Sequence, residues 1–321
     1  MNNRVAAIDC GTNSLRLLIA DIDSVRRQLS DVQRRMEIVR LGQGVDATGR
    51  LAPEALERTM RVLGEYGQEI KAAGASAVRM VATSATRDAS NAADFTRGVQ
   101  AALGVTPEVI SGAEEARLSF AGATAELGAP GPGPHPPPPY LVLDIGGGST
   151  EFVLGAAGPT ARESALAEIS VDIGCVRLTE RHLHTDPPTA AEVAAATADV
   201  DRALNDVAAT IPVQEARTLV GLAGSVTTVT AIALDLPRYD ATKTHHARIA
   251  ARRVHEVTAQ LLRQTRTERA AIGSMHPGRV DVIAAGALVL DRVMQRFGFD
   301  EVVTSEHDIL DGIAWSIADG G

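Results

Sequence analysis

Two segments of the chain share one pattern of apolar and polar positions. Each begins with an apolar run, continues through a turn of glycine and small polar residues, and ends in a second apolar run. Apolar runs bounded by turn residues are typical of buried strands, so each segment is predicted to form strand, turn and strand. Both turns read D-x-G-x-x-S, at Asp9 to Ser14 and about 135 residues later at Asp144 to Ser149. The repetition predicts a duplicated domain, with each half contributing a phosphate loop to a shared cleft.

Helical and strand patterns alternate along the rest of the chain. In residues 53–73 apolar side chains recur about every 3.6 positions, which predicts a helix, and runs at 76–82 and 218–222 predict buried strands. This alternation is typical of an α/β fold. Residues 129–139, APGPGPHPPPP, lack most backbone donors and are interpreted as an extended connection. The expected domains are residues 1–126 with 304–321, then a Pro-rich linker at 127–139, then residues 140–303.

Length and charge limit the classes of partner. The 321 residues are enough for two domains, and 40 acidic against 31 basic side chains give a net charge of −9. Such a chain has no global attraction for nucleic acid or anionic lipid, so a polyanion must be held by a local basic surface. Residues 238–269 carry eight Lys or Arg against three acids and form a candidate track, with a solvated helix face as the alternative.

Cysteine usage and hydropathy indicate the compartment. Cys10 and Cys175 lie far apart in the sequence and lack metal-ligand spacing, so we expect no disulfide scaffold and a reducing cytoplasm. No apolar run approaches the length of a membrane span, and the first residues lack the apolar region of a signal peptide. We expect a soluble protein that binds neither membrane nor nucleic acid.

The second turn carries the chemistry of a phosphate site. Gly146, Gly147 and Gly148 permit positive φ and close approach of a ligand, so their N–H groups can converge on an anion. Ser149 and Thr150 add hydroxyl donors. The turn is bracketed by two carboxylates, which could hold a divalent cation as in phosphoryl-transfer sites: Asp144 and Glu151. The alternative is a glycine-rich hairpin with a solvated acid at each end.

Two arginines and one glutamate are further candidates. Arg16 follows the first loop and could bind a phosphate in bidentate fashion, although its alternation with apolar neighbours also suits a solvent-facing position. Arg87 ends a small polar turn after a predicted strand, where α/β proteins bind ligands; a helix N-cap with an exposed Arg is the alternative. Ser111 and Glu114 have capping-box spacing, which leaves Glu115 available as a general base, although an exposed glutamate would look identical.

A glycine–serine turn follows the predicted strand at 218–222. Gly224 and Ser225 open a predicted helix, where free N–H groups and the positive end of the helix dipole could hold an anion. The same pattern is common in α/β folds that bind no ligand there, so both interpretations stay open.

Five motifs together resemble one family. The chain is similar to the exopolyphosphatase / guanosine pentaphosphate phosphohydrolase (Ppx/GppA) family, within the actin, sugar kinase and Hsp70 superfamily, from Asp9 to about Gly312. The motifs, in family order, are Asp9-Cys-Gly-Thr-Asn-Ser-Leu-Arg16, Ala82-Thr-Ser-Ala-Thr-Arg87, Ser111-Gly-Ala-Glu-Glu-Ala-Arg117, Asp144-Ile-Gly-Gly-Gly-Ser-Thr-Glu151 and Gly174-Cys-Val-Arg-Leu-Thr179. The resemblance implies two ribonuclease H-like (actin-like ATPase) domains flanking a central cleft.

The resemblance also implies roles for individual residues. Glu115 matches the glutamate that activates the attacking water, and Asp144, Glu151 and Asp9 match carboxylates near a Mg²⁺ or Mn²⁺ ion. With the glycine–serine turn included, the expected phosphate-binding residues are Gly11, Thr12, Asn13, Ser14, Arg16, Arg87, Gly146, Gly147, Gly148, Ser149, Thr150, Gly224 and Ser225. Cys10 departs from the small or aliphatic residue that is frequent in the family, and we expect no effect.

The activity implied is Mg²⁺-dependent hydrolysis of the terminal phosphoryl group of inorganic polyphosphate. Guanosine pentaphosphate presents the same terminal phosphoanhydride and is the alternative substrate. An ATP-dependent sugar or acetate-type kinase and a non-catalytic polyphosphate- or alarmone-binding protein are the competing classes. Longer family members carry a helical C-terminal extension beyond the point where this chain stops, so we expect less processive hydrolysis of long polyphosphate. A homodimer is the default expectation.

Overall fold

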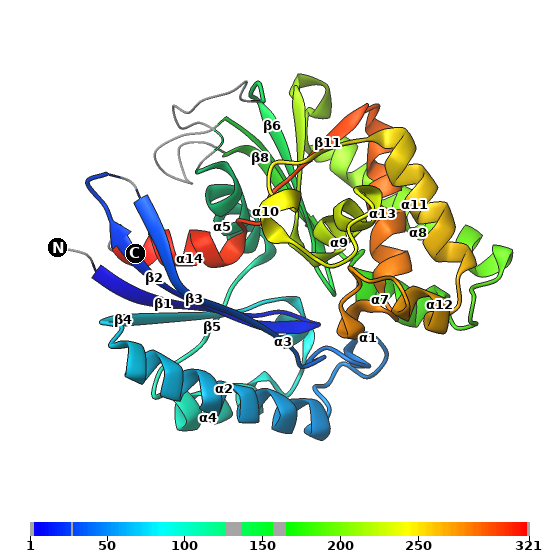
Figure 1. Cartoon of the computed structure of the whole chain (residues 1–321). Helices are drawn as coiled ribbons and strands as arrows, with labels where there is room; N and C mark the ends of the chain where they lie inside the picture. Colours follow the sequence, from blue (N-terminus) through cyan, green and yellow to red (C-terminus); the bar gives the residue numbers. More distant parts are fainter. Residues whose placement is uncertain (1–2, 27, 126, 128–135, 157–164, 320–321) are drawn as a thin grey trace. The chain divides into compact units, whose positions relative to one another are not determined.

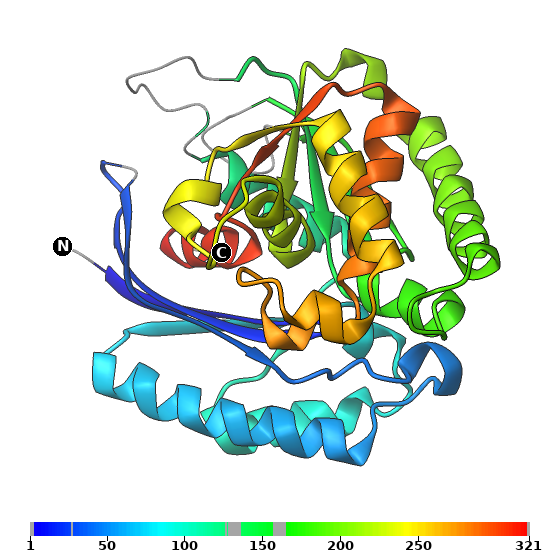
Figure 2. The same cartoon turned by 45° about the vertical axis from the view of Figure 1, so that its right-hand side comes forward.

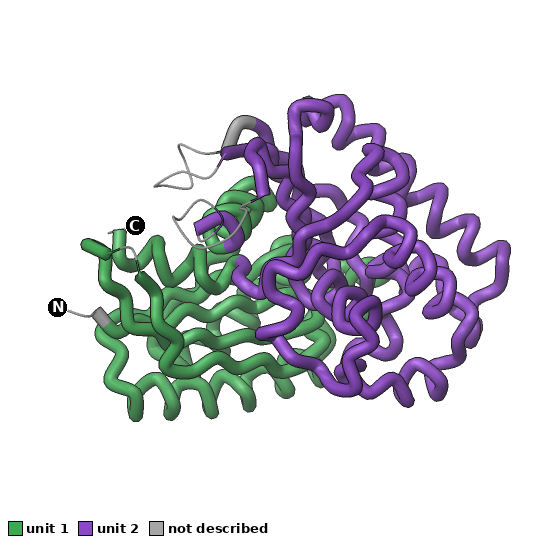
Figure 3. The backbone as a smooth tube through the Cα atoms, turned by 45° about the horizontal axis from the view of Figure 1, so that its top comes forward, with its two compact units in different colours: residues 1–122, 309–321 green, residues 123–308 purple. Residues whose placement is uncertain are grey.

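The chain divides into two compact units. The computed structural model describes residues 3–26, 28–125, 127, 136–156 and 165–319. Unit 1 comprises Met1–Gly122 and Ile309–Gly321, and unit 2 comprises Ala123–Asp308 (Figure 3). The expected boundaries were 126 and 304, whereas the first division falls inside a continuous helix and the second directly before one. The pattern of apolar residues in the sequence is not interrupted at residue 122 or at residue 308. Most of the expected Pro-rich linker, residues 128–135, lies outside the described residues.

Unit 1 is built on a five-stranded mixed sheet in the order β3-β2-β1-β4-β5 (Figure 1). The strand β1 pairs antiparallel with β2 and parallel with β4, while β2 pairs antiparallel with β3 and β4 pairs parallel with β5. The strands are β1 (Asn3–Cys10), β2 (Ser14–Asp23), β3 (Gln28–Ile38), β4 (Ala77–Ala82) and β5 (Glu108–Val109).

Both faces of the unit 1 sheet are covered, which explains why β1 is continuously apolar from Val5 to Ile8. Ala6 and Ile8 pack in one core, and Val5 and Ala7 pack in the other with residues of the last helix. The helices α2 and α4 cover the first face (Figure 2), and α14 covers the second. The helices of unit 1 are α1 (Val45–Thr48), α2 (Pro53–Ala73), α3 (Ser84–Asp88), α4 (Ala92–Leu103), α5 (Gly112–Thr124) and α14 (Ile309–Ala318).

Unit 2 repeats this plan around a six-stranded sheet in the order β10-β11-β9-β6-β7-β8. Its strand β6 pairs antiparallel with β7 and parallel with β9, as β1 does with β2 and β4. The strands are β6 (Tyr140–Ile145), β7 (Thr150–Gly155), β8 (Ala165–Val171), β9 (Thr218–Leu222), β10 (Arg248–Ala250) and β11 (Glu301–Thr304). The predicted strand–turn–strand segments are therefore confirmed as the hairpins β1–β2 and β6–β7.

The helices of unit 2 supply one large apolar core. Leu141 and Leu143 of β6 belong to this core together with Val200 of α8 and Val289 of α13. The helical elements are α7 (Cys175–His182), α8 (Ala190–Thr210), η1 (Val213–Glu215), α9 (Ala223–Ala233), α10 (Ala241–Thr244), α11 (Ala251–Arg263), α12 (Arg266–Ala270), η2 (Pro277–Arg279) and α13 (Ile283–Phe297). Within the residues described here, no helix has the length and apolarity to cross a membrane.

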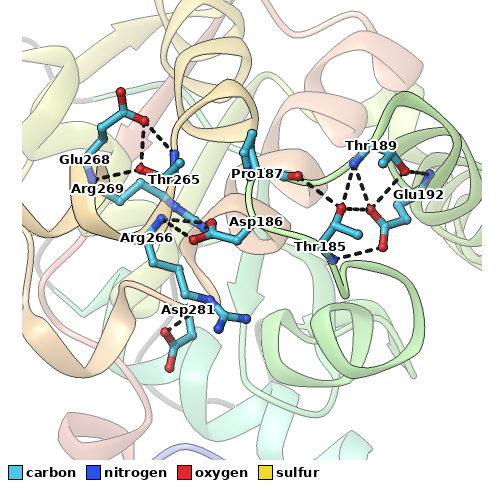
Figure 4. Close-up of polar contacts among 10 residues, drawn as sticks. All are labelled: Thr185, Asp186, Pro187, Thr189, Glu192, Thr265, Arg266, Glu268, Arg269 and Asp281. Atoms are coloured by element: carbon cyan, nitrogen blue, oxygen red, sulfur yellow. Dashed lines mark hydrogen bonds and ion pairs between the residues drawn. The ribbon is translucent and has the colours of Figure 1, made fainter.

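The basic stretch 238–269 matches the solvated-face alternative better than a polyanion track. Six of its eight Lys and Arg side chains form ion pairs, several with acids outside the stretch, so much of its positive charge is balanced locally. Figure 4 shows one group, in which Asp186 accepts from Arg269 at 3.2 Å and Arg266 lies 3.8 Å from Asp281. The other pairs are Lys243–Asp240, Arg248–Glu301, Arg252–Glu256 and Arg253–Asp235.

A buried ion pair joins α14 to β3 in unit 1. The carboxylate of Asp311 is only 1% exposed and binds both terminal nitrogens of Arg34, at 2.6 and 3.2 Å. Removing one member of a fully buried pair typically costs 3–5 kcal/mol, because the other charge is left without its partner. Arg34 is 30% exposed and keeps its contact with Asp31 at 2.8 Å, so we expect Asp311→Asn to lower the free energy of unfolding by less, about 2 kcal/mol.

Urea unfolding followed by circular dichroism measures this difference. Asp31→Asn is the matched control, since Asp31 contacts the same Arg34 at 2.8 Å from an exposed position. Exposed pairs contribute roughly 0–1 kcal/mol. Equal losses of unfolding free energy for Asp311→Asn and Asp31→Asn would show that the burial of Asp311 adds nothing to what its pair with Arg34 contributes.

Candidate functional site

The second loop, Gly146 to Ser149, is anchored by hydrogen bonds that its carbonyl groups accept from the start of α7. Residues 174–177 at the start of α7 donate to three of these carbonyls in turn. Because N–H and C=O of a trans peptide point in opposite directions, the N–H groups of Gly147, Gly148 and Ser149 turn away from α7. The bonds are Cys175 N to Gly146 O at 2.9 Å, Val176 N and Arg177 N to Gly147 O at 2.9 and 3.1 Å, and Gly174 N and Arg177 Nε to Gly148 O at 3.3 and 2.6 Å. Successive amides presented by a glycine turn form a surface suited to an anion.

The first loop, Gly11 to Ser14, has the same construction. Its first amide donates to the carbonyl of Ser14 at 3.0 Å, as Gly146 does to Ser149 at 3.0 Å. Residues 39–42, which follow β3 as residues 174–177 follow β8, donate to the carbonyls of Thr12 and Asn13 at 2.9 to 3.1 Å. The N–H groups of Asn13 and Ser14 therefore turn away from this anchor. The duplication predicted from the D-x-G-x-x-S motif thus extends to the segments that hold each loop.

The two hairpins differ at the residue opposite the aspartate. Residues directly opposite on antiparallel strands project from the same face of the sheet. In the first hairpin Asp9 faces Arg16, whose Nη2 and Nε lie 2.6 and 2.9 Å from one carboxylate oxygen. In the second hairpin Asp144 faces Glu151. The first hairpin therefore places an ion pair beside its loop, and the second places two carboxylates.

The pair in the second hairpin fits a divalent cation better than Asp9 does. Asp144 and Glu151 are 7% and 2% exposed, and Ser170 donates to Glu151 at 2.7 Å. In the described part of the chain, no group of three or more His, Cys, Asp or Glu is arranged to hold a metal. Mg²⁺ nevertheless binds through one or two carboxylates when substrate phosphates and water complete its shell. Asp9, by contrast, has its charge compensated by Arg16.

Glu115 and Arg87 come together in unit 1. The carboxylate Oε2 of Glu115 lies 3.4 Å from Nη1 of Arg87, and the same nitrogen donates to the carbonyl of Ile110 at 2.9 Å. Ser111 begins α5 by accepting from the amide of Glu114 at 3.2 Å, as the predicted cap requires. The carboxylate of Glu114 forms a separate ion pair with Arg79, at 3.0 Å. The buried Glu115 therefore has a different environment from the half-buried Glu114.

The turn at Gly224 opens the helix α9 directly after β9, as predicted. Ser225 is buried, and a Cβ at Gly286 of α13 would lie only 2.3 Å from its hydroxyl, so this side chain faces the helix α13. Gly224 has a side chain over it instead, because the guanidinium of Arg279 occupies the space of a Cβ, at 1.6 to 1.8 Å. A side chain at position 224 would therefore displace the guanidinium of Arg279. No local pattern pointed to Arg279, which lies 55 residues away from Gly224 in the chain.

Both cysteines are free and buried. Burial raises the pKa of the Cys10 thiol well above its usual value, and burial likewise raises the pKa of Cys175. A thiol is a nucleophile or metal ligand as thiolate, so neither side chain is suited to the chemistry of the adjoining loops.

Each unit thus collects its own set of predicted residues. Unit 1 holds the first loop, with the hydroxyl of Thr12 2.9 Å from that of Ser84 on α3, and carries Arg87 and Glu115. Unit 2 holds the second loop, the Asp144–Glu151 pair and the Gly224 turn. Thr150, expected at a phosphate, donates its hydroxyl to the carbonyl of Ile173 at 2.8 Å. The segments 39–42 and 174–177 were not expected to anchor the loops.

Comparison with known proteins gives one consistent result. Residues 18–319 match the model of the Ppx/GppA phosphatase family. The chain is 50% identical to exopolyphosphatase 2 of Mycobacterium tuberculosis, with 98% of each chain covered. Among solved structures it is similar to an exopolyphosphatase-like protein, with 42% identity, 99% of both chains covered and a TM-score of 0.92. It is also similar to the Ppx/GppA family member of Aquifex aeolicus, with 31% identity, 99% of both chains covered and a TM-score of 0.79.

Proposed function

This chain belongs to the Ppx/GppA phosphatase family, and on that premise we propose that it is an exopolyphosphatase that releases orthophosphate from the end of inorganic polyphosphate. The two sheets have the actin-like ATPase fold of the family. The observation that carries the proposal is the second loop, whose amides at Gly147, Gly148 and Ser149 turn away from their anchor on α7. Such amides suit a phosphate chain, which has oxygens to accept at every unit and no side groups to recognise.

Glu115 supplies the base in this proposal. Its carboxylate accepts a proton from a water molecule while the water oxygen attacks the terminal phosphorus, and the bridging oxygen leaves with the shortened chain. Arg87 supports this role because it lies 3.4 Å from the carboxylate and is itself tied to the carbonyl of Ile110. A base held in one orientation is closer to the geometry of attack than a freely rotating one.

Asp144 and Glu151 would hold a Mg²⁺ or Mn²⁺ ion. They fit it because opposed carboxylates on neighbouring strands lie on one face of the sheet, and Ser170 fixes one oxygen of Glu151. When bound, a divalent cation would neutralise charge on the phosphoryl oxygens during transfer. We therefore expect turnover to require the metal.

The loops provide local attraction in a chain whose net charge is −9. In unit 1 the amides of Asn13 and Ser14 are presented beside the Asp9–Arg16 ion pair. In unit 2 the second loop is accompanied by Arg279 over Gly224. Charge-assisted bonds from amides and guanidinium groups to phosphate are roughly twice as strong as neutral ones, so a few of them can offset the repulsion of the acidic surface.

The proposal is tested by measuring orthophosphate release from four substrates in parallel. Short polyphosphate, long polyphosphate, guanosine pentaphosphate and ATP are each incubated with the full chain, with Mg²⁺, with Mn²⁺ and with excess chelator. We expect metal-dependent release from polyphosphate in the absence of any acceptor. If orthophosphate is released from guanosine pentaphosphate and not from polyphosphate, guanosine pentaphosphate is the substrate and the proposal of an exopolyphosphatase is wrong. Tight binding of polyphosphate without release under any condition would identify a binding protein and overturn the proposal.

A further inference from the structure

The backbone of the helix that carries Glu115 lies directly against Gly312 of α14. A Cβ added at Gly312 of α14 would lie 2.0 Å from the carbonyl oxygen of Leu118, 2.7 Å from its carbonyl carbon and 3.0 Å from its Cα. All three atoms belong to the main chain of α5, so no side-chain rotation can make room. The two helices are side by side in Figures 1 and 2, and Gly312 sets the distance between them.

Polar contacts hold the same two helices to the sheet of unit 1. Arg79 of β4 donates to the hydroxyl of Ser316 on α14 at 2.7 Å and to the carboxylate of Glu114 on α5 at 3.0 Å. The Arg34–Asp311 pair fixes the start of α14 to β3. Both helices are held to the sheet, so a wider spacing at Gly312 would move α5 as well as α14.

Glu115 follows any such movement. It lies three residues before Leu118, on the neighbouring turn of the same side of α5, and a helix moves as a rigid body over one turn. An added Cβ needs about 1 Å of extra separation to reach an acceptable distance from the Leu118 oxygen, because the present value is 2.0 Å. A displacement of about 1 Å in a catalytic group costs roughly 100-fold in rate.

We propose that Gly312 is a positioning residue for the reaction, which sets the place of Glu115 through its contact with the backbone of α5. The inference rests on the proposed role of Glu115 as the base. The chain passes between the units at Gly122 and Ala123 inside α5, and at Asp308 and Ile309 directly before α14. The pair of helices therefore carries both connections.

Gly312→Ala tests the proposal in the full chain. We expect kcat for orthophosphate release to fall about 100-fold while KM changes less than about 3-fold, because the loops that bind phosphate lie on other elements. Gly64→Ala is the matched control: Gly64 lies inside helix α2 of the same unit, and a Cβ there meets nothing within 4 Å. Circular dichroism must show equal helix content for both variants.

A double variant separates positioning from general destabilisation. If Gly312 acts through Glu115, Gly312→Ala combined with Glu115→Gln loses no more activity than Glu115→Gln alone. Losses that multiply, or a Gly312→Ala variant with wild-type kcat, would overturn the inference while the wild-type activity still supports the proposed function. If Gly312→Ala does not fold, Ser316→Ala removes the Arg79 bond to α14 without adding an atom. It must lower kcat at unchanged KM, and wild-type kcat in Ser316→Ala would likewise overturn the inference.

Discussion

Glu115→Gln is expected to bind polyphosphate like the wild type and to lose about 10²- to 10⁴-fold in kcat, the range of a general base. Glutamine keeps the size of the side chain and an oxygen that can accept from Arg87, so the start of α5 and the contact to Ile110 should persist. What it cannot do is accept the proton of the attacking water. The loss should therefore appear in kcat, since the phosphate-binding loops are unchanged.

Steady-state phosphate release gives kcat and KM, and calorimetric titration with short polyphosphate gives the binding constant. Glu57→Gln in α2 is the control, because Glu57 is an exposed carboxylate in the same unit. Near wild-type turnover in Glu115→Gln would exclude Glu115 as the base. An equal loss in both variants would point to an effect of net charge on the approach of the polyanion.

Gly174→Ala is expected to lower kcat/KM by about 10- to 1000-fold, chiefly through KM. A Cβ at Gly174 would lie 2.2 Å from the carbonyl oxygen of Gly147 and 2.4 Å from the amide nitrogen of Gly148. Both atoms are main chain, so the second loop must move away from α7. The displaced amides then lose their common direction, and each bond from an amide to a charged phosphate contributes about 1.5–3 kcal/mol. Loss of one such bond gives about 10- to 160-fold, and partial loss of a second extends the range to about 1000-fold.

The measurement is the dependence of phosphate release on polyphosphate concentration, together with thermal unfolding. Gly64→Ala again serves as control for a glycine that has open space around it. A Gly174→Ala variant with unchanged KM would show that the anchored form of the second loop is not the form that binds phosphate. A fall in kcat alone would assign the loop to the chemical step and not to binding.

The hairpins were predictable because their information is local. The strand β1 is continuously apolar from Val5 to Ile8, and β6 is apolar except at Asp144, since both faces of each strand are buried, and a turn that contains glycine follows each strand. Glu115 could be singled out because Ser111 and Glu114 mark the first turn of α5, and the structure gives Glu114 a separate partner in Arg79.

Features that depend on distant pairs were not predictable. Arg279 fills the space above Gly224, and Gly312 contacts the backbone of Leu118 from almost 200 residues away, but neither glycine has a local pattern that names its neighbour. The division of the chain at residue 122 escaped prediction for a related reason. The helix α5 continues past this residue and keeps its apolar period, so only the tertiary contacts reveal the division.

The discontinuity of unit 1 sets the order in which the two halves can be completed during translation. All the chain that builds unit 2 has been synthesised once Asp308 is added, whereas the sheet of unit 1 lacks α14 until Ile309–Ala318 follow. Domains generally fold as units while the chain emerges from the ribosome. Unit 1 therefore begins to be synthesised first but is completed last. In a nascent chain, α5 with Glu115 cannot pack against α14 until α14 has left the ribosome.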